Sequence, residues 1–301
     1  MRTDRRGILV GFLAYLAWGL ITIYWKALHH FDAFELIGHR IVWSALLMVL
    51  LLSISRRWTT LVRALRTPRT LGILVAAALL LSCNWTFYVY SVVHGHVVET
   101  ALGYFMAPIG TMCIGVLAMK ETLRLPQRVA LIFAVAAVVV LTVAYGRVPW
   151  LALGLALTWT TYGWLKRLVP LHPIESLAGE TAVVFVPALV LVLVHQSSGH
   201  GVLSTGSTTE IVLLLLSGIA TAVPLMMFAY AAKRVPFTIL GPMNYLVPSI
   251  NFLLGVLAYH EHLTAARLVG FCLVWVALVI MTIDMLRRPR LAPAEPATAD
   301  C

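Results

Sequence analysis

Ten apolar runs, each long enough to cross a lipid bilayer, divide this chain almost from end to end. A helix needs about 20 apolar residues to cross the hydrocarbon core. Such runs lie at approximately 7–26, 35–55, 70–92, 99–119, 127–146, 148–165, 178–195, 211–231, 235–259 and 266–286. A soluble domain needs more surface charge than the 11% charged residues found here beside 61% hydrophobic ones. The sequence therefore predicts an all-α integral membrane protein with ten transmembrane helices and short connections.

The basic residues favour one side of that membrane. When the loops are assigned alternately to two sides, 18 of the 22 Lys and Arg residues fall on the side of the N-terminus: Arg2, Arg5, Arg6, Arg56, Arg57, Arg63, Arg66, Arg69, Lys120, Arg124, Arg128, Lys166, Arg167, Lys233, Arg234, Arg287, Arg288 and Arg290. Loops rich in Lys and Arg stay in the cytoplasm, so we expect a cell-membrane protein with both termini cytoplasmic. The net charge of +10 then reflects topology, and we expect no nucleic-acid partner.

One apolar stretch of the chain recurs 140 positions later. Residues 108–123 and 248–263 are identical at 7 of 16 positions. The identities include Pro108 with Pro248, Gly115 with Gly255, and Glu121 with Glu261. A shared apolar composition does not readily align Pro, Gly and Glu together, so we infer an internal duplication.

The duplication predicts the domain organisation. We expect a first five-span repeat over residues 1–146, a second over 147–288, and a disordered cytoplasmic tail over 289–301. Because five is an odd number, the second repeat must enter the membrane upside down relative to the first. Inverted repeats of this kind are typical of secondary transporters, whose substrate site lies near the midplane between the halves.

Several short motifs resemble those of a known family. They are His39-Arg-Ile-Val-Trp-Ser44, Asn84-Trp85, His94-Gly-His-Val-Val-Glu99 followed by Leu102-Gly-Tyr-Phe105, Pro149-Trp150, Glu180-Thr181, Pro224-Leu225 and Asn244-Tyr245-x-x-Pro248. Over nearly the whole chain, the sequence resembles the RarD group of the EamA branch of the drug/metabolite transporter superfamily. Asn244 departs from the resemblance, because a Gln is expected there. The resemblance implies multi-pass transport of small molecules and names no substrate.

Arg40 is a charged residue inside the span predicted over residues 35–55. An isolated charge in lipid is costly, and such groups usually face a cavity or a partner. Glu99, at the same membrane face in the fourth span, is the best-placed carboxylate for Arg40, and Glu35 is the local rival. Alternatively, Arg40 extends its long side chain to the outer headgroups. His39 is either a cavity residue or a buried histidine with a hydrogen-bond partner.

Polar side chains also mark the third, fourth and ninth predicted spans: Asn84, Tyr88, Tyr104, Asn244, Tyr245 and Asn251. In a continuous helix, Asn244, Pro248 and Asn251 share one face at spacings of four and three. Such side chains either line a substrate cavity or hold helices together, since amides hydrogen-bond across membrane helices. Three deep tryptophans either stack on a flat substrate or, more commonly, fill space between helices: Trp18, Trp85 and Trp159.

The function class follows from what is present and what is missing. We recognise no HExxH, carboxylate-rich or Ser/His/Asp motif and no phosphate-binding loop, so we expect neither an enzyme nor a cofactor. The ten histidines leave a metal-cation transporter as a minor alternative, but they lack a ligand spacing, and we expect no metal site. We predict a secondary transporter that moves a small organic metabolite or drug-like molecule by alternating access. The alternatives are an integral membrane enzyme and a sensor or assembly partner without transport activity.

Overall fold

The computed structural model describes residues 4–28, 30–93, 97–146, 148–197, 199, 201–254 and 265–286. All regular secondary structure in these residues is helical. The helices are α1 (Arg5–Lys26), α2 (Ala33–Ser55), α3 (Trp58–Leu65), α4 (Pro68–Val93), α5 (Val97–Leu117), α6 (Leu125–Tyr145), α7 (Trp150–Leu168), α8 (Pro173–Ser197), α9 (Val202–Thr205), α10 (Thr208–Ala232), α11 (Phe237–Met243), α12 (Leu246–Leu253) and α13 (Ala265–Leu286). The predicted tail at 289–301 lies outside the described residues, as do Gly255 and Glu261 of the duplication.

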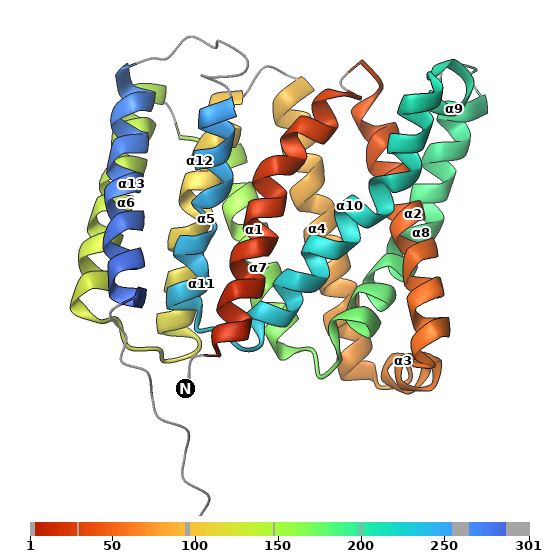
Figure 1. Cartoon of the computed structure of the whole chain (residues 1–301), viewed down its shortest axis with the longest axis horizontal. Coiled ribbons are helices and arrows are strands. Elements are labelled where there is room, and N and C mark those ends of the chain that lie inside the picture. Colours follow the sequence, from red (N-terminus) through yellow and green to blue (C-terminus); the bar gives the residue numbers. More distant parts are fainter. Residues whose placement is uncertain are drawn as a thin grey trace, which may run out of the picture.

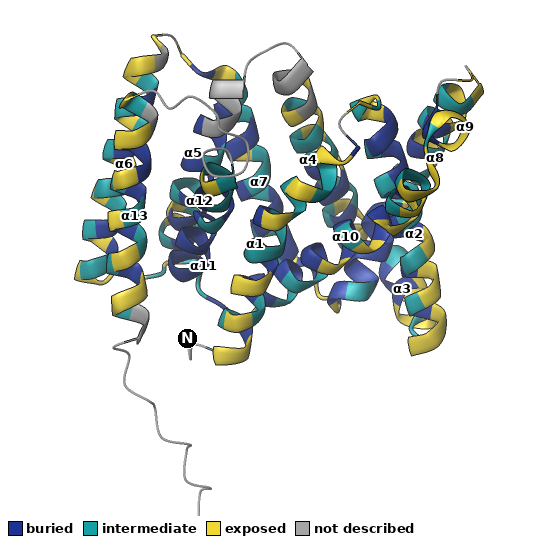
Figure 2. Ribbon diagram, turned by 45° about the horizontal axis from the view of Figure 1, so that its top comes forward, coloured by how far each residue is buried: buried dark blue, intermediate teal, exposed yellow. Residues whose placement is uncertain are grey.

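Long apolar helices make this a multi-pass membrane protein. Six segments among the described residues are long and apolar enough to cross a bilayer: Arg5–Lys26, Ala33–Ser55, Pro68–Tyr88, Leu125–Ala144, Pro173–Thr205 and Thr208–Ala232. Large aliphatic side chains cover the outside of the bundle, among them Leu125, Val143 and Val186, which are between 66% and 75% exposed. Buried residues face the interior of the bundle (Figure 2). Such an outer surface matches a lipid environment rather than water.

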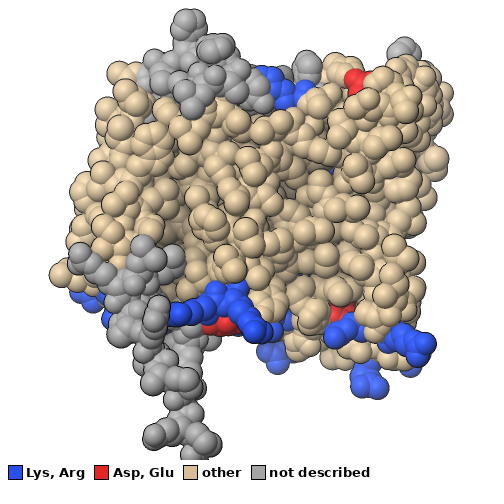
Figure 3. Space-filling model, viewed as in Figure 1, with Lys and Arg blue, Asp and Glu red and all other residues tan. Residues whose placement is uncertain are grey.

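The helices stand side by side, and the short helix α3 lies at the end of the bundle that also carries the N-terminus (Figure 1). Lys and Arg side chains gather at this same end (Figure 3). Arg56, Arg63 and Arg66 are exposed there, next to or within α3. We call this end the basic end and the opposite one the far end.

The main packing partners of the helices lie in opposite halves of the chain. Helix α1 packs against α10, α2 against α8 and α10, α4 against α7, α5 against α7 and α11, and α6 against α13. At the crossing of α2 and α10, a Cβ on Gly218 would lie 2.5 Å from the backbone carbonyl of Trp43. Only glycine allows this close approach, which brings Ser44 to within 3.3 Å of the Gly218 carbonyl oxygen.

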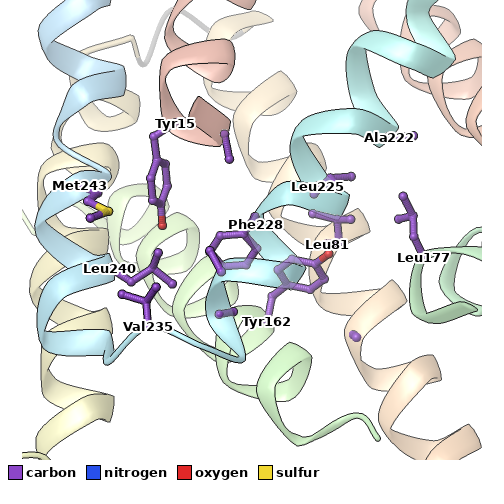
Figure 4. Close-up of a cluster of buried hydrophobic side chains, with 14 of the residues drawn as sticks. Tyr15, Leu81, Tyr162, Leu177, Ala222, Leu225, Phe228, Val235, Leu240 and Met243 are labelled. Atoms are coloured by element: carbon purple, nitrogen blue, oxygen red, sulfur yellow. The ribbon is translucent and has the colours of Figure 1, made fainter. Parts of the chain in front are cut away.

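The largest core cluster joins aromatic rings from α1, α7 and α10 (Figure 4). Tyr15, Tyr162 and Phe228 are fully or almost fully buried, and the last two rings stack with centroids 6.2 Å apart. Trp18 and Trp159 meet edge to face at 5.0 Å, which is a favourable geometry for aromatic pairs. Two of the three deep tryptophans therefore fill space between helices.

The ninth predicted span is not one continuous helix. It consists of α11 and α12, which are separated by Asn244 and Tyr245. The amide of Asn244 bonds the Gly241 carbonyl at 2.9 Å, a spacing of three residues instead of four. Pro242 and Pro248 lack the amide hydrogens that would continue the α-helical pattern. The predicted shared face of Asn244, Pro248 and Asn251 assumes a continuous α-helix, so it stays a prediction.

Candidate functional site

A narrow pocket lies between α2, α4, α8 and α10, so each half of the chain contributes two of its walls. It is lined by Ile41, Ser44, Ala78, Leu81, Ser82, Trp85, Leu177, Glu180, Thr181, Val184, Thr221 and Leu225. The lining combines apolar side chains, four hydroxyl groups and one carboxylate. Small-molecule sites have a similar lining, mostly apolar with a few polar groups, but the space of about 20 Å³ inside this pocket is far smaller than theirs.

Arg40 lies beside the pocket, about 10 Å along α2 from the far end. Its Nε donates a hydrogen bond to Thr221 Oγ1 at 3.0 Å. Its guanidinium carbon lies 4.7 Å from the ring centroid of Trp25 and 4.5 Å from that of Trp85. These are cation–π contacts. Because Trp85 and Thr221 also line the pocket, the side chain packs inward and does not extend away from the protein.

Two of the predicted tyrosines accompany Arg40. The rings of Tyr88 and Tyr104 meet edge to face with centroids 6.3 Å apart. Tyr88 lies one turn of α4 after Trp85, whose ring contacts the Arg40 guanidinium. Tyr104 is seven residues from the start of α5 and Arg40 seven from the start of α2, so both lie at the same depth. Arg40, Tyr88 and Tyr104 thus come together from three helices.

Of the two carboxylates proposed as partners of Arg40, the structure describes the side chain of only one. Glu35 is buried, accepts a hydrogen bond from the Val202 amide at 2.8 Å, and lies 3.6 Å from His39 Nε2. It therefore caps the start of α9 and not Arg40, while the buried Nε2 of His39 makes no hydrogen bond among the described residues. Glu99 belongs to α5, but its side chain lies outside the described part of the structure, so its pairing with Arg40 stays a prediction.

A buried ion pair, which sequence reasoning missed, lies on the basic-end side of the pocket. Lys166 Nζ is 2.6 Å from Glu180 Oε1, with side chains 1% and 2% exposed. Lys166 also donates to Ser176 Oγ at 2.7 Å, and the Tyr162 hydroxyl donates to Glu180 Oε2 at 3.2 Å. Burial of both charges requires such a network of partners. We call Lys166 and Glu180 the buried pair.

Arg40 and Glu180 occupy equivalent positions in their helices. Each is the eighth residue, counted from Ala33 in α2 and from Pro173 in α8. Since α2 begins at the far end and α8 at the basic end, the two charges approach the pocket from opposite sides. The carboxylate already has its cation in Lys166, whereas no carboxylate among the described side chains lies within ion-pair distance of Arg40.

Three of the predicted polar residues connect helices. Asn84 donates to the Leu155 carbonyl and to Thr158 Oγ1, both at 2.9 Å. Asn251 accepts from Thr22 Oγ1 at 2.8 Å. The hydroxyl of Tyr245 donates to the Phe105 carbonyl at 3.2 Å. Asn244 is buried between α11 and α12. The hydrogen bonds of Asn84, Asn251 and Tyr245 thus go to neighbouring helices and not to Arg40.

Glu121 fixes the basic end of the two halves to each other. Its carboxylate accepts hydrogen bonds from the amides of Phe237 and Thr238 at the start of α11, both at 2.9 Å. It also lies 3.5 Å from Arg167. A carboxylate at a helix N-terminus pairs with free amides and with the helix dipole. Glu121 is thus a cap for α11.

This helical membrane protein has known relatives. Residues 5–143 and 147–283 each match the EamA-like transporter family. Protein RarD of Streptomyces exfoliatus is 44% identical over 97% of this chain and 95% of its own length. The uncharacterized transporter YojE of Bacillus subtilis is 33% identical over 97% of this chain and 98% of its own. The chain therefore belongs to the EamA-like transporter family, and the predicted resemblance to that family and its RarD group is confirmed.

The fold is also shared with a protein of known crystal structure. That structure aligns with a TM-score of 0.69 at 19% sequence identity, and the alignment covers 93% of this chain and 99% of the other. At this identity the similarity concerns the fold alone.

Proposed function

We propose that this protein is a secondary transporter that moves a small organic metabolite or drug-like molecule across the cell membrane. The observation that carries the proposal is the pocket whose walls come equally from both halves of the chain, with Arg40 on one side and the buried pair on the other. The family and the name given to the Bacillus subtilis relative support it. In this proposal α11 and α12 together form one of ten spans, and both termini are cytoplasmic.

The pairing of the helices supports an inverted repeat of residues 1–146 and 147–288. A pseudo-two-fold axis would exchange α1 with α7, α2 with α8, α4 with α10, α5 with α11–α12, and α6 with α13. The observed contacts occur in sets that this exchange interchanges. The contact of α1 with α10 corresponds to that of α7 with α4, and the contact of α5 with α7 to that of α12 with α1. Rocking of one half against the other would then expose the pocket alternately to the two sides.

The transport function is tested by comparing metabolites inside and outside cells that have or lack the protein. We expect the distribution of at least one small molecule to change and to be restored by the wild-type chain. Ser82→Trp, which places an indole in the pocket, should not restore it, whereas Ser53→Trp at an exposed site of α2 should. The proposal fails if no metabolite responds to the protein.

The orientation is tested by single cysteines in a cysteine-free chain. Arg63 in α3 and Leu203 in α9 are both exposed, so labelling at these positions reports the side of the membrane and not burial. An impermeant thiol reagent should label Leu203→Cys in intact cells and Arg63→Cys only after lysis. Labelling of both positions in intact cells would contradict cytoplasmic termini.

A further inference from the structure

The guanidinium of Arg40 is held in place by groups that leave most of its hydrogen-bond donors unused. A guanidinium has five N–H donors in a planar fork. Thr221 takes the Nε donor, and Trp25 and Trp85 pack against the cation through their rings. The four donors on the two terminal nitrogens have no acceptor among the residues that the structure describes. Among the described residues, none competes with a ligand for this edge of the guanidinium.

The surroundings of this edge favour an anion. Tyr88 lies one turn of α4 after Trp85, whose ring contacts the guanidinium, and the Tyr88 ring contacts that of Tyr104. A phenol can donate a hydrogen bond to a negative charge. A cation at membrane depth is costly unless an opposite charge accompanies it. Glu180 cannot supply that charge, because Lys166 lies 2.6 Å from its Oε1.

We infer that Arg40, Tyr88 and Tyr104 form a cradle that binds a carboxylate group of the transported molecule. The planar fork of arginine matches the two oxygens of a carboxylate, and such paired, charge-assisted hydrogen bonds are strong and specific. The inference rests on the proposed transport function, since it names the chemical class of the substrate.

The pocket indicates what the rest of that molecule is like. Trp85 and Thr221 belong both to the contacts of Arg40 and to the pocket lining, and Ile41, Leu81 and Leu225 continue the lining with apolar surface. When the pocket widens in the proposed transport cycle, the body of a ligand held by its carboxylate in the cradle lies against these apolar side chains. The class is a small carboxylate with an apolar body.

Thermal unfolding of the purified full-length protein in detergent tests the inference, because a ligand that binds the folded state raises Tm. The probes are hexanoate and phenylacetate, each compared with its uncharged amide, hexanamide or phenylacetamide. We expect the carboxylates to raise Tm and the amides of equal shape not to do so. Arg40→Gln should weaken carboxylate binding at least about 30-fold, since it removes one partner of a buried charge pair.

Tyr88→Phe and Tyr104→Phe retain the aromatic rings and should each weaken binding roughly tenfold through the loss of one hydrogen bond to a charge. These two tyrosine variants test the inference if Arg40→Gln does not fold. Arg63→Gln, on the exposed face of α3, is the matched control and should bind like the wild type. The inference would be overturned if the amides raised Tm as much as the acids do, or if neither acid raised Tm. Wild-type affinity in the tyrosine variants would also overturn it. A protein that fails this test but still changes the metabolite distribution keeps its proposed function.

Discussion

Replacement of Lys166 by methionine is expected to lower the free energy of unfolding by about 3–5 kcal/mol. Methionine fills much of the lysine volume but leaves the Glu180 carboxylate, 2% exposed, without the cation that lies 2.6 Å away. A buried charge that is left without its partner destabilises the fold far more than the removal of both charges does. Unfolding in mixed micelles with a chemical denaturant measures the effect. Glu180→Gln should be similarly harmful, because it leaves Lys166 unpaired.

A double change and a surface pair provide the controls. Lys166→Met combined with Glu180→Gln leaves no uncompensated charge, so its effect should be smaller than the sum of the two single effects. Arg234→Met removes an exposed cation whose Nε lies 3.7 Å from Asp4, both side chains being more than a third exposed. Such a change is expected to stay within about 0.5 kcal/mol. An effect of Lys166→Met no larger than that of Arg234→Met would show that the buried pair contributes nothing to stability.

Replacement of Arg40 by alanine is expected to abolish transport of the metabolite identified in the cellular comparison. The change removes the only described cation beside the pocket that lacks a carboxylate partner among the described side chains. If Glu99 pairs with Arg40, Glu99→Ala should be as harmful, and the double variant less harmful than the sum of both, because neither charge is left desolvated. Independent, additive effects on the transport rate would exclude the pair.

The same pair predicts competition with the substrate. A carboxylate of Glu99 at Arg40 and a carboxylate of the substrate would share one cradle, so Glu99→Gln should increase the affinity for hexanoate. Glu35→Gln is the matched control, since the Glu35 carboxylate contacts Val202 and His39 and not Arg40. An unchanged affinity in Glu99→Gln would place Glu99 outside the cradle.

The helices could be predicted from the length of the apolar runs, and the errors in their predicted ends have a physical cause. The run at 35–55 corresponds closely to α2, which begins at Ala33 and ends at Ser55. The sixth run was expected to end at residue 165 and the seventh to begin at 178, yet α7 continues to Leu168 and α8 begins at Pro173. The added segments contain Lys166 and Glu175, and each of these charges has an ion-pair partner on another segment, Glu180 and Arg57 respectively. The hydropathy of one segment does not show whether a charge in it has an ion-pair partner on another segment.

The candidate site was predictable only where depth in the membrane decided it. Arg40 was predicted as a site residue from its depth inside a span, and the structure places its guanidinium against Trp85 of the pocket lining. The role of Asn84 or Asn251 could not be predicted, because an amide in a membrane helix binds whichever group the neighbouring helix presents. The contacts of Trp25 and Thr221 with Arg40 could not be predicted either, because they depend on how α1 and α10 pack against α2.

The pairing of helices across the chain also determines when the protein can mature during synthesis. Helices α1, α2 and α4 leave the ribosome well before their partners α10, α8 and α7. Until those partners are inserted, the faces destined for them can contact only lipid or the insertion machinery. The nascent first half therefore waits for the second, because the surface of α2 at Trp43 and Ser44 stays uncovered until Gly218 of α10 packs against it. If the chain is divided after Gly146, the two fragments should therefore assemble when they are expressed together. Either fragment expressed alone should be degraded.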